Sequence, residues 1–363
     1  MSKSTPTSSS RPTPLLLGLH AGGMVTAIGN SMTQTAASWL TQVRRMRRIQ
    51  LEGYADPYTI ADCESVTQGL AGPDRLIALL GSAVAEACTG IKALHLDAPA
   101  ECLEILVLPS RLEKEECDHV SEKLSEWLRP YETWTARPRQ RNILRADATG
   151  SWVALEYAYR ALEANPRLQH VMIAAVDSLC DLAFLRDAAA ADRLLQPGNV
   201  QGYVPGEAAT CLLLTRIANI RTLHADGFAL HRPAFAKAPA PLWPSIDRPD
   251  SASLGQTLNG ALQAAGMQAM HISHLESDMD GSDWRAQIES GALNRAVFSE
   301  TTALPHWRPA TLLGQTGAVS GLLGWLLPAV LHARHIDPVN SVLNWSVEPS
   351  GEIAACVLER SPQ

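Results

Sequence analysis

The stretch NILRADATGSWVALEYAYRALEANPRLQHVMIAAVDS, which spans residues 142–178, decides the fold of this chain. Two apolar residues at 143–144 lead into a tight turn of small residues, and a helical segment rich in Ala and Leu follows at 152–165. A proline ends that segment, and the apolar run at 171–176 has the length of a buried strand. The order strand, turn, helix, strand predicts a βαβ unit, which presents its turn at the carboxyl edge of the sheet.

The turn reads Ala148-Thr149-Gly150-Ser151 and stands at the expected N-terminus of the helix. An enzyme of this architecture would place a nucleophile here, because the N–H groups of a helix N-terminus favour negative charge. Ala148 has no nucleophilic atom. Thr149 and Ser151 are the fallback nucleophiles, and either would need a base within hydrogen-bond reach.

This frame resembles the β-ketoacyl synthase branch of the thiolase-like fold, whose turn reads roughly T-A-C-S-S-S-L-x-A-L, with Cys as the acyl-accepting nucleophile. Aligning Val153-Ala154-Leu155 with the end of that pattern places Ala148 on the Cys. The opening of the chain carries the same resemblance, since M-V-T at 24–26 and G-N-S at 29–31 match the family's first segment. The resemblance implies that no acyl thioester can form at position 148.

Two further frames of the family fall on this chain. The frame K-S-x-x-G-H-x-x-x-A-x-G covers residues 310–321, which puts Ala310 on the Lys and Gln315 on the His. The frame H-G-T-G-T, anchored on a following Gly and Glu, puts Asp278 on the second His. The resemblance therefore implies a degenerate site, in which Ala148, Asp278, Gln315 and Ala310 replace Cys, two His and Lys.

Three residues are candidates for substrate binding. Glu207 lies in VPGEAA at 204–209, which resembles the family's G-[FY]-V-x-G-E-G-A pattern. In that family the Glu belongs to a structural network beside the catalytic cavity, and the simpler interpretation is a buried carboxylate that ties a hairpin. Gly314 and Gly317 flank Gln315 in a second glycine-rich turn, which opens an apolar helix.

Composition and charge limit the possible partners. The chain has 363 residues, of which 46% are hydrophobic, so it can bury a large core. A net charge of −7 gives no indication of a nucleic-acid partner. Seven scattered cysteines without a CxxC motif indicate buried thiols in a reducing cytoplasm. The apolar run at 317–331 is too short to span a membrane and contains a proline, so we expect a buried helix.

No cofactor or metal is expected. Asp278, Asp280, Ser282 and Glu289 mimic four positions of a calcium loop, but Asp283 stands where that loop needs glycine.

The chain is expected to consist of two similar halves. Residues 1–13 are a polar tail that we predict to be disordered, residues 14–216 form the first half and residues 217–363 the second. The pattern predicts helices at 72–89, 112–128, 182–195, 254–265, 284–298 and 318–334, and strands at 14–19, 105–108, 212–214, 221–231, 270–275, 341–347 and 352–359. A helix is also expected from the turn after 19 to about 43.

The resemblance implies a duplicated thiolase-like α/β fold with five layers, α/β/α/β/α, and a dimer. We expect residues 171–178 to be the edge strand of that dimer, because an unpaired apolar edge would risk aggregation. Arg44, Arg45, Arg47 and Arg48 have two interpretations, the charged end of a helix or a docking patch for an acidic carrier protein.

Three functions follow from the resemblance. The first is a catalytically inactive binding or accessory subunit, either a chain-length partner of an active synthase or an accessory protein of a secreted effector, as in type VI secretion. The second is an active acyltransferase with an unconventional nucleophile, and the third is a purely structural subunit. The partners implied are a second copy or another thiolase-fold subunit, an acyl carrier protein or an effector protein.

Overall fold

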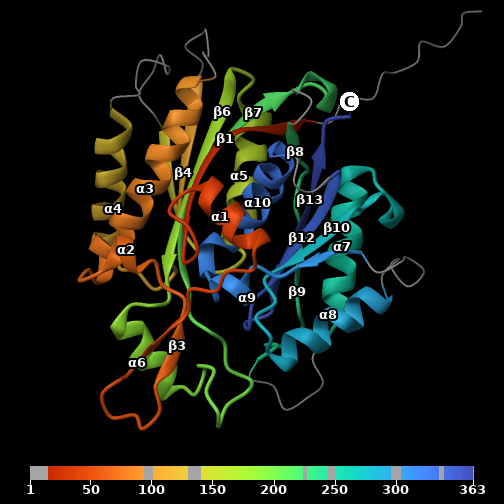
Figure 1. Cartoon of the computed structure of the whole chain (residues 1–363). Coiled ribbons are helices and arrows are strands. Elements are labelled where there is room, and N and C mark those ends of the chain that lie inside the picture. The colour runs from red at the N-terminus through yellow and green to blue at the C-terminus, as the bar shows by residue number, and fades with distance from the viewer. Residues whose placement is uncertain are drawn as a thin grey trace, which may run out of the picture.

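A computed structural model describes residues 15–93, 101–129, 140–223, 227–243, 250–295, 304–334 and 339–362 (Figure 1). The tail expected at 1–13 lies outside these residues. The described chain forms two α/β halves whose main sheets are joined edge to edge, and a separate two-stranded sheet.

The first half supplies a five-stranded sheet in the order β5-β4-β6-β7-β1. Its elements are β1 (Leu16–Thr26), α1 (Met32–Leu40), β2 (Arg47–Ile49), β3 (Tyr58–Ile60), α2 (Glu64–Thr67), α3 (Gly72–Ala93), β4 (Glu101–Leu108), α4 (Lys114–Leu128), β5 (Gln140–Arg145), α5 (Gly150–Ala164), β6 (Leu168–Ser178), α6 (Leu182–Ala190) and β7 (Glu207–Ile217). Strands β5, β4 and β6 run parallel, and β7 is antiparallel to both β6 and β1.

The second half repeats this plan with the order β11-β10-β12-β13-β9. Its elements are β8 (Phe228–Leu230), β9 (Ala234–Lys237), α7 (Ala252–Ala265), β10 (His274–Ser277), α8 (Asp283–Arg295), β11 (His306–Trp307), α9 (Ala310–Leu313), α10 (Ser320–Ala333), β12 (Ser341–Val347) and β13 (Glu352–Arg360). As in the first half, the first three strands of this order, β11, β10 and β12, run parallel, and β13 is antiparallel to both β12 and β9. Strand β8 pairs with both β1 and β13 and so connects the two sheets.

The helices complete the five layers. Helices α3 and α4 cover the outer face of the first sheet, α7 and α8 cover the outer face of the second, and α5 and α10 lie between the sheets (Figure 1). The indole rings of Trp152 and Trp325 meet edge to face at the α5–α10 contact, with centroids 6.0 Å apart. This arrangement confirms the predicted duplicated five-layered fold. The division of the chain at 216/217 stays a prediction.

Glycines allow the two central helices to approach their neighbours. A Cβ at Gly150 would lie 2.8 Å from Cβ of Ala146, and a Cβ at Gly321 would lie 2.6 Å from Cβ of Ser151. Both distances are shorter than packed carbon atoms tolerate. The sharp turn before α5 and the close α5–α10 contact therefore both depend on glycine.

Several local predictions need correction. The first strand continues through AGGMVT to Thr26, because its whole length pairs with β7. Helix α1 begins only at Met32, and Ser31 caps it by accepting a hydrogen bond from Gln34 N. Helix α4 begins at Lys114, where Glu113 and Glu116 form a capping box. Of the strand predicted at 221–231, residues 224–226 lie outside the described chain; among the described ones Phe228–Leu230 forms β8, and Ile220–Thr222 is a 3₁₀ turn.

The prediction that residues 171–178 form a dimer edge is wrong. They belong to β6, whose two sides are occupied by β4 and β7. Apolar residues on both faces are typical of a central strand, and the sequence pattern alone does not say where in the sheet that strand lies. Among the described strands, the free edge of the first sheet is β5, which pairs only with β4.

The arginines at 44–48 do not end a helix, because α1 stops at Leu40 and Arg47–Ile49 forms β2. Arg47 is held by Asp62, with 2.9 Å from Nε to each carboxylate oxygen. The carrier-docking interpretation of Arg44, Arg45 and Arg48 stays a prediction. Within the described part of the chain, no helix is both long and apolar enough to cross a membrane.

Candidate functional site

The site is organised around the turn between β5 and α5. Ala148 is only 7% exposed, and its side chain lines a cavity of about 620 Å³ together with Gln315, Gly317 and Glu348. The turn at 148–151 and the glycine-rich turn at 314–317, which come from different halves of the chain, therefore meet at one cavity. Apolar and aromatic side chains form much of the remaining wall: Leu179, Phe184, Tyr203, Trp243, Trp284 and Pro349.

Backbone hydrogen bonds hold the segments of the site together. Gly206 N donates to the Gln315 carbonyl at 2.8 Å, and Gln315 N donates to the Val204 carbonyl at 2.8 Å. Ala318 N donates to Oδ2 of Asp177 at the end of β6, at 3.0 Å. The hairpin around Glu207 and the turn around Gln315 are thus neighbours of the turn at Ala148.

The side chains of Gln315 and Asp278 are engaged with the protein itself. Nε2 of Gln315 donates to the Asp278 carbonyl at 2.8 Å and to Oδ2 of Asp280 at 3.0 Å. The Asp278 carboxylate lies 2.7 Å from Nη1 of Arg285 and also accepts hydrogen bonds from Ser346. These contacts occupy the amide donors of Gln315 and pair the charge of Asp278.

Ala310, Gly314 and Gly317 provide no reactive group. Ala310 opens α9 and lines a separate void of about 10 Å³, which it shares with Gln315. Gly314 has a φ of 66°, and a Cβ there would lie 2.8 Å from the Val204 carbonyl. Gly317 has a φ of 53°, and a Cβ there would lie 2.0 Å from the Asp177 carboxylate. Both glycines allow backbone conformations and close approaches that another residue would prevent.

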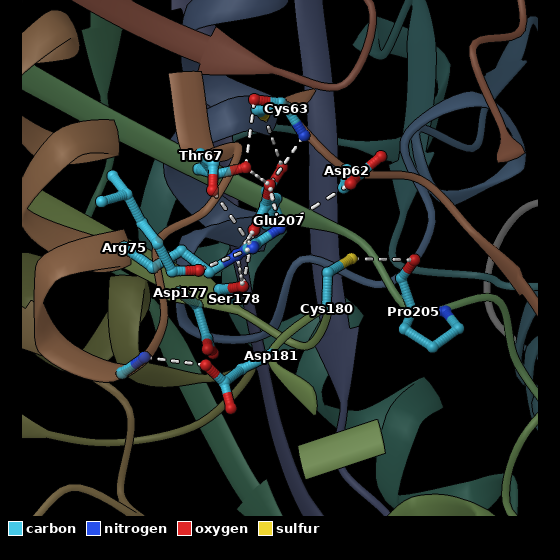
Figure 2. Close-up of polar contacts among 12 residues, drawn as sticks. Asp62, Cys63, Thr67, Arg75, Asp177, Ser178, Cys180, Asp181, Pro205 and Glu207 are labelled. Atoms are coloured by element: carbon cyan, nitrogen blue, oxygen red, sulfur yellow. Dashed lines mark hydrogen bonds and ion pairs between the residues drawn. The ribbon is translucent and has the colours of Figure 1, made fainter. Parts of the chain in front are cut away.

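Glu207 lies in a saturated network of polar contacts, which Figure 2 shows. Its carboxylate pairs with Arg75, at 2.6 Å from Nε to Oε2, and is completely buried. Cys63 N, Thr67 Oγ1 and Ser178 Oγ donate three further hydrogen bonds at 2.6–2.8 Å. Burial acts to lower the pKa of Arg75, but the Glu207 carboxylate outweighs this and the pKa is raised. Glu207 is not among the residues that line the cavity.

The two fallback nucleophiles differ in their surroundings. Ser151 is completely buried, and its hydroxyl donates to the Ala318 carbonyl at 2.9 Å between α5 and α10. It is therefore a structural contact of the central layer. Thr149 donates both its N–H and its hydroxyl to Oε1 of Glu348, each at 2.7 Å.

Glu348 is the site residue that sequence reasoning missed. It lies in the tight turn between β12 and β13, where its N–H donates to the Glu352 carbonyl at 2.8 Å. Burial raises the pKa of its carboxyl group, and the two hydrogen bonds from Thr149 oppose that shift. The only sequence signal was its position in Asn344–Gly351, where the family's glycine-rich loop was expected and not found.

Three arginines line the cavity, and two of them, Arg111 and Arg285, are ion-paired with aspartates, whereas the buried Nε of Arg193 has no hydrogen-bond partner among the described residues. Nη2 of Arg111 lies 2.7 Å from Oδ1 of Asp177, and its guanidinium lies over the Phe184 ring at 5.0 Å. Arg193 lies over the same ring at 5.6 Å. No group of three or more His, Cys, Asp or Glu side chains in the described residues is arranged to hold a metal ion.

Comparison with known proteins gives matches only at the level of structure. No protein-family model and no curated protein matches the sequence. The ketosynthase (ApeO) in complex with its chain length factor (ApeC) from Xenorhabdus doucetiae is 18% identical, with 97% of this chain and 99% of that chain covered and a TM-score of 0.71. The ishigamide ketosynthase/chain length factor is 16% identical, with 96% and 99% covered and a TM-score of 0.73.

A type II polyketide acyl-carrier protein in complex with its ketosynthase bound to the hexaketide (AntDE:AntF) gives a TM-score of 0.76. It is 12% identical, with 96% of this chain and 100% of that chain covered. At these identities the similarity shows the fold alone.

Proposed function

This chain has the thiolase-like fold of ketosynthases, and from this premise we propose its function. It is a non-catalytic subunit, which pairs with a second thiolase-fold chain. The similar structures include two in which a ketosynthase is paired with a chain length factor. The observation that carries the proposal is the turn at the cavity. Ala148 stands where a nucleophile is expected, and the neighbouring N–H group is already bonded to the Glu348 carboxylate.

Alanine at position 148 prevents acylation, and its surroundings oppose condensation. Thioester formation needs a thiolate or another activated nucleophile, which alanine cannot supply. Stabilising an enolate or an oxyanion needs donors aimed at the developing charge. The Gln315 amide donates to Asp278 and Asp280 instead, and the Glu348 carboxylate would repel a developing anion.

The edge of the first sheet offers a surface for pairing. Among the described strands β5 pairs on one side only, and Nδ2 of Asn142 on this strand is buried without a hydrogen-bond partner in the described residues. Val153 on α5, which contacts β5, is 40% exposed. An edge strand with unpaired backbone groups favours the addition of a strand from another chain, and an exposed apolar side chain on the adjoining helix can pack against that chain. In the absence of another subunit, a second copy of this chain can occupy the same edge.

This surface gives a first prediction. The purified protein should be a dimer at micromolar concentration, and Val153→Arg should weaken the dimer at least about tenfold, because a guanidinium would be buried in an apolar contact. The matched control is Leu40→Arg on α1, whose side chain is 42% exposed and whose helix contacts α10 and β1. Light scattering coupled to gel filtration measures both variants. A wild-type monomer, or equal dissociation of the two variants, would contradict pairing through β5.

One observation favours the alternative of an acyltransferase. The Thr149 hydroxyl donates to a carboxylate at 2.7 Å, which is the arrangement of a nucleophile and its base. However, the same oxygen of Glu348 also accepts the Thr149 N–H, and Thr149 is not among the residues that line the cavity. We therefore favour a capping role for the pair. The intact mass of the wild type and of Thr149→Ala after incubation with an acyl thioester separates these two functions.

A further inference from the structure

The part of the cavity next to Ala148 has an unexpected polarity. Helix α5 is 15 residues long, and its N-terminus carries partial positive charge from aligned peptide dipoles. Such a terminus ordinarily binds an anion from a ligand. Here Oε1 of Glu348 accepts hydrogen bonds from the N–H and hydroxyl groups of Thr149, while the contact of Oε2 within the described part of the chain is one of 3.4 Å with Ser350. The protein therefore supplies its own anion at this position.

We propose that Glu348 determines which ligands the cavity takes, and that the end of a ligand reaching Ala148 is a hydrogen-bond donor, best a protonated amine on an apolar chain. An anionic oxygen at this position would meet a fixed like charge instead of a free N–H group. This proposal rests on the proposed function in one respect: the cavity must bind a ligand without reacting covalently with it.

The remaining charges of the cavity agree with this polarity. The acidic side chains in its described lining are Asp147, Asp177, Asp187, Asp280 and Glu348, and the basic ones are Arg111, Arg193 and Arg285. Arg111 and Arg285 are each ion-paired with buried aspartates, and Arg193 lies over an aromatic ring. With both members of these ion pairs set aside, Asp147, Asp187 and Glu348 remain against Arg193, so a cationic ligand meets an excess of acidic groups.

The walls suit the apolar part of such a ligand. Tyr203 and Trp243 line the cavity beside Leu179 and Pro349 and can pack against an aliphatic chain. Aromatic faces also attract ammonium groups. A short alkylammonium ion combines both properties.

Glu348 is held in place by the turn that carries it. Gly351 N donates to the Glu348 carbonyl at 3.0 Å, and the N–H groups of Leu242 and Trp243 donate to the Pro349 carbonyl at 2.8 and 3.2 Å. These bonds fix the turn against the cavity wall. Moving the carboxylate aside for an anionic ligand would cost the two hydrogen bonds from Thr149, so the preference for donors is preorganised.

The test compares n-octylammonium with octanoate, two ligands of equal chain length and opposite charge, by isothermal titration calorimetry at pH 8. We expect the wild type to bind octylammonium at least about tenfold more tightly than octanoate. In Glu348→Gln this ratio should fall to about threefold or less, because the amide keeps an oxygen for Thr149 but loses the charge.

Two variants control for indirect effects. Glu348→Asp retains the charge and should retain the preference for octylammonium. Glu126→Gln removes an exposed carboxylate of α4 that pairs with Lys123 and does not line the cavity, so the ratio should stay at the wild-type value.

Three results would overturn the inference: octanoate binding at least as tightly as octylammonium, no binding of either ligand at millimolar concentration, or an unchanged ratio in Glu348→Gln. Each of them would leave the proposed function standing. Pairing through β5 and the absence of covalent chemistry are measured separately, by light scattering and by protein mass.

Discussion

Replacing Glu207 by Gln is expected to lower the free energy of unfolding by about 3–5 kcal/mol, because it leaves the buried Arg75 without its main counter-charge. The carboxylate also accepts hydrogen bonds from Cys63 N, Thr67 and Ser178, so it connects α2, α3 and the ends of β6 and β7 (Figure 2). An amide has one acceptor oxygen and cannot replace all of these bonds. A loss of this size is a large part of the stability of an ordinary domain.

Urea unfolding followed by circular dichroism measures the loss at Glu207. The matched control is Glu352→Gln, which breaks an exposed pair with Lys237 and should cost less than about 1 kcal/mol. If Glu207→Gln and Glu352→Gln unfold at similar urea concentrations, the network is not the structural element we describe. A variant that cannot be purified folded, while Glu352→Gln can, agrees with the expected direction.

The second large effect concerns Glu276 on β10, which is expected to make stability fall as pH rises. Its carboxyl group is fully buried, neither oxygen has a hydrogen-bond partner among the described residues, and burial raises its pKa to about 8 from an ordinary value of 4.5. Between these two values the folded protein keeps a proton that the unfolded chain releases. The stabilisation is therefore fully present below about pH 4.5 and is lost as pH rises through about 8, at about 1.4 kcal/mol per pH unit.

Glu276→Gln removes this dependence, since the amide stays neutral at every pH. The variant should match the wild type near pH 4.5 and exceed its free energy of unfolding by on the order of 4 kcal/mol near pH 8. Unfolding curves in urea at several pH values give the difference directly. Glu126→Gln, at an exposed position of α4, controls for the general effect of losing one charge. Parallel curves for wild type and Glu276→Gln would contradict the prediction.

The sequence predicted the fold well where local pattern and resemblance agreed. The turn before α5, the helix itself and strands β12 and β13 were placed within a few residues. Errors arose where the outcome depends on distant partners. The strand at 171–178 is buried on both faces, and only the order of all five strands shows that it lies inside the sheet. The glycines after residue 19 resembled a turn, yet they continue β1 under α3 and α10.

The same contrast applies to the site. Ala148, Gln315 and Asp278 could be located because each falls in a recognisable frame. Their present contacts could not be predicted, since the partners of Gln315 and Asp278 are other side chains of the second half. Glu348 was missed because it reaches Thr149 across 199 positions of the sequence, from a turn that no frame matched.

The protein is proposed not to support acyl transfer. Position 148 allows a test of this claim, because a slightly larger side chain fits there. Ala148 lines the cavity, so the slightly larger side chain of Ala148→Cys has space to enter it. The nearby Glu348 carboxylate should keep the pKa of such a thiol high and its acylation slow. Acylation of Ala148→Cys therefore shows whether an acyl thioester reaches the site. Acylation of the wild type shows whether the site itself still has a nucleophile.

The most direct measurement is the intact mass of the protein after incubation with an acyl thioester, made on the wild type, Ala148→Cys and Thr149→Ala. We expect the wild type and Thr149→Ala to keep their unmodified mass, and Ala148→Cys to gain one acyl group. A stoichiometric adduct on the wild type that disappears in Thr149→Ala would contradict the claim and identify Thr149 as the nucleophile.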